Sequence, residues 1–352
     1  MKVLLLPVNL ASDISHKVRA LRRIGVDARG FSLAPSKIQT GENITTFSLS
    51  SGKRLPDRVR KFVAYQEIWR MIAWADVLHW VGEPVMFEQS IHRAYLKWID
   101  KPGIVQFMGS DIRIPDADFE INPYYRNVFH NGYEYVSESR VRSLKTQHFY
   151  AELNYFPLEF IGLERYIDQG LFAKRFRTWQ PVDLASHEAI FPVAVATRPV
   201  VVHAPSAPKA KGTEHIIGAV EQLKAGYEFD FVLVENMERR DALRQIRDCD
   251  IFIDQLILGS HGYAAVEAMA FGKPVIAYIN DVIGKDYPHD LPIVNGNPDN
   301  IAEVLGSLIG DGERRHKLGI ASRKYAEKYH DEDKIARDLV DIYAETIRRH
   351  RA

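Results

Sequence analysis

The chain has 352 residues, of which 46% are hydrophobic and 26% are charged, with 22 Gly, 17 Pro and a single Cys. This length predicts about two domains, and the composition excludes a disordered chain, a collagen-like repeat and a disulfide-stapled mini-protein. The 46 basic and 46 acidic residues cancel, which argues against a globally basic nucleic-acid-binding protein.

The first half of the chain alternates short apolar runs with amphipathic segments. A strand at 3–6 precedes a loop at 7–12 and a helix at 13–23 that Ser12 or Asp13 can cap. The order of strand, helix and strand indicates a parallel α/β sheet. The further elements expected here are a strand at 27–31, a helix at 57–74, a strand at 77–80, a helix at 88–98, a strand at 103–108 and short units near 133–137 and 153–156.

The stretch 181–199 contains three prolines and is the expected domain boundary. After it the alternation restarts. The expected elements are strands at 200–203, 229–235, 250–254 and 275–278, and helices at 212–224, 239–247, 262–271, 298–309, 312–328 and 331–350. The sequence thus predicts two doubly wound, Rossmann-like α/β domains with a cleft between them, in which ligands bind at the carboxyl ends of the strands.

The neutral total charge conceals an asymmetry. Residues 1–180 hold 25 Lys and Arg against 19 Asp and Glu, whereas residues 181–352 hold 21 against 27. One interpretation is that the chain forms two bodies of opposite net charge, each with its own partner. The other is that charged residues are simply distributed unevenly over the surface.

The single cysteine and the apolar runs bear on the compartment. Cys249 lies in an apolar run and is expected to be a small buried residue, and one cysteine fits a reducing compartment. The apolar N-terminus is too short for a signal peptide, and no stretch approaches the roughly 20 apolar residues of a membrane span. We expect a soluble, cytoplasmic protein.

The stretch HGYAAVEAMAFGKPVIAYI, residues 261–279, is the most informative motif. It predicts a helix that begins after Gly262, carries Glu267 and ends at Gly272. The N–H groups at a helix N-terminus can bind an anion, and a carboxylate just inside can bind a pair of sugar hydroxyls. Taken alone, Glu267 is more simply an ordinary helix residue.

This stretch resembles the C-terminal signature of the family-4 (group 1) type of GT-B glycosyltransferases. In that family a glutamate, seven residues and a second glutamate precede Ala-Met-Ala, Gly and Pro-Val. The second glutamate matches Glu267, which the resemblance implies holds the nucleotide ribose. HAPSAPKAKGTEHI, residues 203–216, is similar to the start of the family's donor domain, and Lys211 falls on the lysine that meets the donor diphosphate. An ammonium group suits that role, because it neutralises the charge that develops as the sugar leaves.

The sequence departs from the family pattern at two donor positions. The first glutamate of the pair falls at Gly259, and an arginine expected before Lys211 falls at Ser206. Lys209 can supply the second positive charge, and Ser260 or His261 can contact the sugar. The donor-binding residues expected from the resemblance are Ser206, Lys209, Lys211, Gly259, Ser260, Gly262, Tyr263 and Glu267.

The N-terminal half resembles the family more loosely. IVQFMGSDIR, residues 104–113, is similar to a segment on the acceptor side of the cleft, although Met108 stands where a histidine is common. Asp111 and His261 are the candidate catalytic residues, and a loop or cap role for Asp111 is the alternative. The expected acceptor-side residues are Asn9, Ser12, His79 and Ser110, with a structural His79 as the alternative.

The resemblance implies a metal-independent, retaining glycosyltransferase of the hexosyltransferase type, with a UDP- or GDP-sugar as co-substrate and no bound cofactor. The expected domains are an acceptor-binding domain at 1–185, a donor-binding domain at 186–330 and a helix at 331–352 that returns to the first domain. The acceptor is left open between a glycan such as a cell-surface polysaccharide, a lipid-linked molecule and a small molecule. Two alternatives remain: a GT-B domain pair that only binds nucleotide, and a nucleotide-sugar epimerase. No GxGxxG follows a strand and no Walker loop, HExxH or GxSxG is present.

A basic run from Lys53 to Lys61 leads into apolar Phe62 and Val63. Such a run is usually the solvated face of an amphipathic helix. The alternative is a peripheral contact with an anionic membrane, or with a lipid-linked acceptor, through the N-terminal domain.

Overall fold

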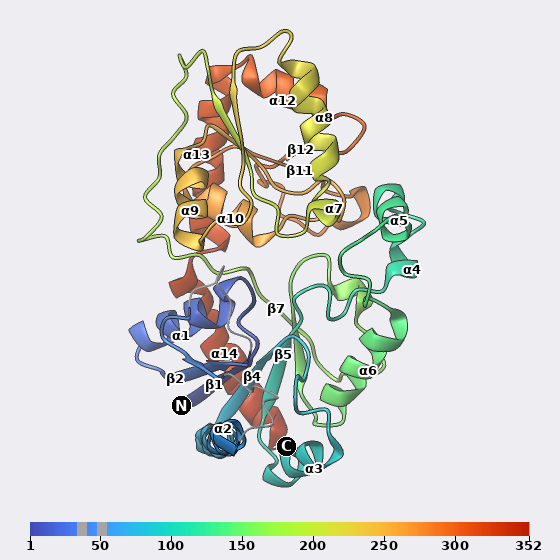
Figure 1. Cartoon of the computed structure of the whole chain (residues 1–352). Coiled ribbons are helices and arrows are strands. Elements are labelled where there is room, and N and C mark those ends of the chain that lie inside the picture. The colour runs from blue at the N-terminus through green and yellow to red at the C-terminus, as the bar shows by residue number, and fades with distance from the viewer. Residues whose placement is uncertain (34–40, 48–54, 352) are drawn as a thin grey trace. The chain divides into compact units, whose positions relative to one another are not determined.

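The computed structural model describes residues 1–33, 41–47 and 55–351. Lys53 and Arg54 of the basic run lie outside these residues. The chain divides into two compact units (Figure 1). Unit 1 comprises residues 1–113, 139–181 and 332–352, and unit 2 comprises residues 114–138 and 182–331.

Unit 1 is built on a parallel sheet whose described strands follow the order β3-β2-β1-β4-β5-β6-β7. The strands are β1 (Lys2–Pro7), β2 (Asp27–Ser32), β3 (Thr45–Thr46), β4 (Val77–Val81), β5 (Gly103–Gln106), β6 (Phe156–Glu159) and β7 (Phe176–Arg177). The helices are α1 (Asp13–Arg23), α2 (Leu55–Trp74), α3 (Ser90–Ile99), α6 (Arg140–Ala151) and α14 (Glu332–His350). The apolar run of β1 is buried from Val3 onward, as expected for a central strand that is covered on both faces.

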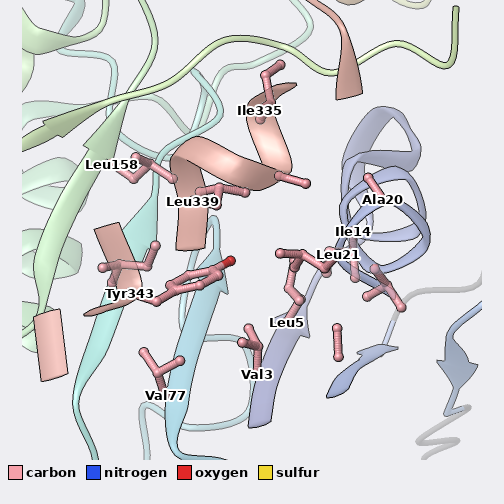
Figure 2. Packing of buried hydrophobic residues seen from close by; sticks show 14 of the residues in the cluster. Val3, Leu5, Ile14, Ala20, Leu21, Val77, Leu158, Ile335, Leu339 and Tyr343 are labelled. Atoms are coloured by element: carbon pink, nitrogen blue, oxygen red, sulfur yellow. The ribbon is translucent and has the colours of Figure 1, made fainter. Parts of the chain in front are cut away.

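The last helix of the chain packs into the core of unit 1, as the family resemblance implied. Ile335, Leu339 and Tyr343 recur every four residues on one face of α14 and lie against Leu5 and Leu158 (Figure 2). The N-terminus of α14 is fixed on α1 by the buried Glu332 carboxylate. This carboxylate accepts hydrogen bonds from the side chains of Arg19 at 2.7 Å and Arg23 at 2.7 Å and pairs with His16 at 3.0 Å.

Unit 2 contains a second parallel sheet, in the order β12-β11-β10-β8-β9 over the described residues. Its strands are β8 (Val200–His203), β9 (Asp230–Leu233), β10 (Ile251–Ile253), β11 (Val275–Ala277) and β12 (Val294–Asn295). Its longer helices are α5 (Pro123–His130), α8 (Thr213–Leu223), α9 (Arg239–Asp248), α10 (Tyr263–Ala270), α12 (Ile301–Ile309) and α13 (Gly312–Tyr329). Its short helices are α4 (Pro115–Asp118), α7 (Pro208–Lys211) and α11 (Asp281–Gly284). Cys249 is buried, as expected.

The two sheets agree closely with the predicted α/β alternation, and the differences have local causes. Residues 133–137 form neither a strand nor a helix, and Tyr133 is instead buried in an apolar cluster rich in aromatic residues. The short unit near 153–156 begins only at Phe156. The helix α6 was not expected, because its buried residues include the polar Ser143, Thr146 and Gln147, so the sequence shows no apolar stripe there. Ser139 caps this helix by accepting a hydrogen bond from Arg142 N.

The division into units also differs from the expected boundaries. The chain enters unit 2 at Val182, four residues before the expected boundary, and residues 114–138 belong to unit 2 rather than to the N-terminal domain. Counted over the observed units, unit 1 holds 29 Lys and Arg against 19 Asp and Glu, and unit 2 holds 17 against 27. The charge asymmetry between the two bodies is therefore larger than the two halves of the sequence indicate.

Replacing Glu332 by Gln is expected to lower the stability of unit 1 by about 2 kcal/mol, because the cations around it lose a buried partner and the two arginines are only partly shielded from solvent. Burial opposes ionisation of Glu332, but the hydrogen bonds from His16 and Arg19 outweigh it and lower the pKa of this carboxyl. The loss should be complete above the ordinary glutamate pKa of 4.5 and should shrink as the pH falls below it. Urea unfolding of the parent and E332Q between pH 3 and 7 measures this, and a difference that is independent of pH would contradict it.

Candidate functional site

The carboxyl ends of β8 and β10 mark the point in unit 2 where a ligand is expected. In chain order the sheet reads 2-1-3-4-5, so the connections from these two neighbouring strands leave in opposite directions. In sheets of this kind the resulting crevice outside the carboxyl ends is the usual binding place. Lys211 lies in the connection that follows β8, and Gly262 lies in the connection that follows β10.

Lys211 is held by two residues that directly follow β10. Its Nζ donates to Asp254 Oδ1 at 2.8 Å and to Gln255 Oε1 at 2.8 Å. The other carboxylate oxygen of Asp254 accepts the backbone N–H of Gly262 at 2.6 Å. Asp254 is almost fully buried, whereas Lys211 keeps 14% of its side chain exposed. We call these three residues, Lys211, Asp254 and Gly262, the lysine cluster.

The lysine cluster explains why residue 262 is a glycine. A Cβ atom at this position would lie 2.9 Å from Lys211 Nζ and 3.3 Å from both carboxylate oxygens of Asp254. The Gly262 N–H, which the sequence assigned to an anionic ligand together with the start of α10, is already donated to Asp254. Tyr263, the first residue of α10, is half-buried.

Glu267 lies further along α10 and is paired with a residue that the sequence did not single out. Arg239 Nη2 donates to Glu267 Oε1 at 2.5 Å, and both side chains are mostly buried. Arg239 is the first residue of α9, the helix that follows β9, so it approaches α10 from the same side of the sheet. A basic residue at the start of a helix that follows a parallel strand is a pattern from which Arg239 could have been identified in the sequence.

Gly259, where the family has its first glutamate, has no room for a side chain. Its φ is +78°, and a Cβ atom would lie 2.9 Å from Asn280 Cβ and 3.4 Å from Asn122 Nδ2. The carbonyl of the neighbouring Ser260 accepts a hydrogen bond from Gln255 Nε2. This segment of the loop is therefore shaped by backbone and amide contacts, and a glutamate at 259 would clash.

His261 is buried, and its ring lies against Tyr287 in a tilted arrangement with the ring centroids 5.1 Å apart. Its Nε2 has no hydrogen-bond partner among the described residues. Burial is the main cause that lowers the pKa of His261, so its imidazole is neutral at pH 7.

Ser206 and Lys209 are exposed on the connection after β8. Lys209 Nζ donates to the Asn131 carbonyl at 3.3 Å, and the Lys209 backbone N–H donates to the Glu134 carboxylate at 2.6 Å. The structure therefore directs Lys209 to the segment 114–138 and not to the lysine cluster.

The segment 114–138 covers three loops at the carboxyl edge of the second sheet. Asn122 Nδ2 donates to the Ile257 carbonyl at 2.8 Å, and Asn280 Nδ2 donates to the Ile121 carbonyl at 2.7 Å. Tyr125 and Tyr133 of this segment share an apolar cluster with Ala207, Ala210 and Ile257. The loops after β8, β10 and β11 are thus fixed against it.

In unit 1 the expected acceptor-side residues near the N-terminus follow β1. Asn9 is buried; its Oδ1 accepts the Ser15 N–H at 3.2 Å, and its Nδ2 donates to the Ser15 hydroxyl at 3.1 Å. Ser12 is also buried, with a φ of 62°. Both residues shape the entry into α1.

Asp111 lies in the loop after β5, next to the half-buried Ser110. Its Oδ1 accepts the backbone N–H groups of Met108 at 3.0 Å and Gly109 at 2.7 Å. Burial raises the pKa of Asp111 to about 6, against the opposing effect of these N–H groups. Asp111 therefore orders its own loop and changes charge close to neutral pH.

His79 lies inside unit 1, and this corrects its expected place on the acceptor side. It is fully buried, and its Nδ1 is 2.7 Å from the Tyr343 hydroxyl while its Nε2 is 3.3 Å from Gln106 Oε1. Burial, together with the Lys17 ammonium, lowers the pKa of His79 to about 3. Since both ring nitrogens contact α14 and the sheet, the structural alternative accounts for this histidine.

The described residues contain neither a cluster of metal-binding side chains nor a helix that could span a membrane. None of their His, Cys, Asp and Glu side chains gather in a group of three or more that could hold a metal ion. None of their helices is both long enough and apolar enough to cross a membrane.

Comparison with known proteins agrees with the motif in unit 2. Residues 224–325 match the model of the family described as glycosyl transferases, group 1. This match contains the Arg239–Glu267 pair as well as Asp254 and Gly262 of the lysine cluster. Comparison with curated proteins finds no match.

Solved structures resemble the chain over nearly its whole length. Sucrose-phosphate synthase from Thermosynechococcus elongatus is 12% identical, with a TM-score of 0.63 and 98% of each chain covered. HepE from Anabaena, solved with UDP and glucose, is 13% identical, with a TM-score of 0.61 over 98% of this chain and 100% of its own. An α-glucosyltransferase solved with UDP-glucose and DNA containing an abasic site is 10% identical, with a TM-score of 0.62 over 97% of this chain and 99% of its own. At these identities the likeness shows the fold. The resemblance recognised in the sequence is thus confirmed: residues 224–325 match the group 1 glycosyl transferases, and the chain has the α/β fold of the GT-B glycosyltransferases, with two Rossmann-like units.

Proposed function

We propose that this protein transfers a sugar from a nucleotide-diphosphate sugar to an acceptor, and that unit 2 holds the donor. The observation that carries the proposal is the lysine cluster at the carboxyl ends of β8 and β10, together with Glu267 on α10, the helix that begins after Gly262, and its partner Arg239 on α9. An ammonium group with an N–H to spare suits a diphosphate, and a fixed carboxylate suits the two hydroxyls of a ribose.

UDP is the nucleotide that we favour over GDP. HepE was solved with UDP and with UDP-glucose, and the α-glucosyltransferase was solved with UDP-glucose. A hexose is accordingly the sugar proposed. In this proposal Ser260 and His261 border the sugar, and the reaction proceeds with retention and without a metal ion.

Unit 1 is the proposed acceptor side. Its excess of basic residues attracts an anionic acceptor, such as a phosphate-linked lipid or an acidic glycan. Asp111 is the proposed base that accepts the proton of the acceptor hydroxyl, and Asn9, Ser12 and Ser110 shape the loops around it. A pKa close to 6 lets this carboxylate take up a proton at neutral pH.

Two other functions predict different products. A nucleotide-sugar epimerase converts the donor when no acceptor is present. A GT-B pair that only binds nucleotide, which the missing glutamate at Gly259 would favour, gives no turnover with any donor and acceptor. Product analysis with donor alone, and then with a panel of acceptors, separates these functions from a transferase.

Replacing Lys211 by Met, or Glu267 by Gln, should remove most of the thermal stabilisation that UDP gives to the parent. A hydrogen bond to a charged group contributes about 1.5–3 kcal/mol, so the Kd for UDP should rise roughly 10- to 100-fold. The matched control is Lys224→Met, since Lys224 is exposed and pairs only with Glu221 among the described residues. Thermal-shift and calorimetric titrations with UDP and GDP measure the effect, and UDP binding that is unchanged in both site variants would contradict the donor site.

The rate of transfer should rise as the pH increases through about 6, because Asp111 must be ionised to accept a proton. In Asp111→Asn this rise should disappear and kcat should fall, while the Kd for UDP stays close to that of the parent. A pH profile of kcat between 5 and 8 tests this. A parental profile that is flat across pH 6, or one that D111N keeps, would remove Asp111 from this role.

We further propose that unit 1 makes a peripheral contact with a membrane through a surface formed by α2 and α3. The two helices lie side by side, since the rings of Trp69 and Tyr95 are 4.6 Å apart. Phe62 on α2 and Ile91 and Trp98 on α3 are exposed by 63%, 71% and 76%. An exposed tryptophan beside aliphatic side chains is typical of a surface that enters the headgroup layer.

The charges on α2 favour an anionic lipid surface. Arg58, Arg60 and Arg70 are exposed, and they have no ion pair among the described residues. The acids on this helix are Asp57 and Glu67. Each basic residue close to an anionic bilayer contributes about 1 kcal/mol to binding, which adds to the burial of the apolar side chains.

Vesicles of mixed phosphatidylcholine and phosphatidylglycerol should bind the protein, and vesicles of phosphatidylcholine alone should bind it weakly. Phe62→Glu and Trp98→Glu should each reduce binding by about tenfold or more, because the burial of a large apolar side chain contributes about 1.5–3 kcal/mol. Ile217→Glu, at an exposed apolar position of unit 2, is the matched control. Co-sedimentation measures binding, and equal binding to both vesicle types, or by all variants, would contradict the proposal.

A further inference from the structure

Lys211 is oriented by two side chains of unit 2. An ammonium group has three N–H bonds, and Asp254 and Gln255 accept two of them at 2.8 Å each. We infer that Asp254 and Gln255 are positioning residues that direct the third N–H of Lys211 toward the donor diphosphate. This inference rests on the proposed function, because it takes the diphosphate as the ligand of Lys211.

The same two residues also close the loop that they begin. Asp254 accepts the Gly262 N–H at 2.6 Å, and Gln255 Nε2 donates to the Ser260 carbonyl. The side chains at the start of the loop 254–262 thus fix the backbone at its end. One structural unit therefore sets the position of Lys211 and the shape of the segment that is proposed to border the sugar.

A carboxylate is needed at position 254, and an amide cannot replace it. One oxygen of Asp254 accepts from Lys211 and the other accepts from Gly262. An asparagine has one acceptor oxygen and one donor NH₂ group, so it would meet either the ammonium or the Gly262 N–H with a donor. Since Asp254 is almost fully buried, the lost contact is costly, because the unsatisfied group lies away from bulk solvent.

The charge of unit 2 makes this positioning important. Unit 2 holds 17 basic against 27 acidic residues, so its overall field repels an anionic donor. Affinity for a diphosphate must then come from short-range contacts, whose strength depends on the direction of each N–H bond. A small displacement of Lys211 therefore costs a large part of the donor affinity.

A double-mutant cycle on the full chain tests the inference, with UDP as the probe. Asp254→Asn should raise the Kd for UDP about tenfold or more, and Lys211→Met should do the same. In the double variant D254N/K211M the second change should add less than about threefold, because Asp254 acts through Lys211. A merely structural role of Asp254 would instead multiply the two losses.

Each outcome of this experiment has one meaning. When K211M has lost affinity, unchanged or tighter UDP binding by D254N, or losses that multiply in the double variant, overturns the positioning role alone. When K211M binds UDP like the parent, Lys211 is no ligand of the diphosphate, and the inference is overturned together with the proposed role of Lys211. If UDP and GDP fail to bind the parent, the proposed function is overturned, and this inference with it. Asp230→Asn, at an exposed partner of Arg198, is the control and should bind UDP like the parent.

A second variant keeps the test open if D254N does not fold. Gln255→Ala removes one acceptor of Lys211 and leaves the buried charge pair intact. The Kd for UDP should rise about threefold to tenfold in Q255A, and this loss should again disappear in the K211M background. An unchanged Kd in folded Q255A would overturn the role of Gln255.

Discussion

The buried carboxylate of Asp254 is the constraint on which the candidate donor site depends. A carboxylate at the end of a central parallel strand lies away from water, and leaving it unpaired would cost several kcal/mol. The ammonium group of Lys211 and the backbone N–H of Gly262 both donate to this carboxylate. The connections after β8 and β10 must therefore meet at this point. The glycine at 262 follows from the same contact, because any side chain there would push the ammonium group away.

Unit 1 also contains a buried carboxylate that needs a partner, and there the partner is enclosed as well. At the start of α1, Asp13 pairs with Lys17 at 2.8 Å, and Gln106 and His79 extend the network to Tyr343 of α14. All of these side chains are fully buried. The network therefore fastens α14 to its sheet, whereas Lys211, in the ion pair of unit 2, keeps 14% of its side chain exposed. The two ion pairs thus differ in the exposure of the cation.

The segment 114–138 accounts for the main departure from the family pattern. It leaves unit 1 after Arg113, folds with unit 2 and returns before Ser139. Its Asn122 lies where a side chain at position 259 would extend, and its contacts with Ile257 and Asn280 keep that loop in place. The absence of the first glutamate is thus matched by the packing around it, which leaves room for a glycine at position 259 and for no larger residue.

The sequence by itself determined the two parallel sheets, since short apolar runs between amphipathic helices are a local pattern that only a buried parallel strand satisfies well. It also identified the part of the chain that the group 1 family model matches, and within the site it singled out Lys211, Gly262 and Glu267. Arg239, Asp254 and Asn122 were not found, because their roles come from partners 8 to 135 residues away in the chain. Only the tertiary structure decided that His79 is enclosed beneath α14, that Lys209 turns to Asn131 and that residues 114–138 join unit 2. The physical reason is the same in each case: burial and the direction of a hydrogen bond depend on which distant segment packs against a residue, and the local pattern of the sequence carries no record of that segment.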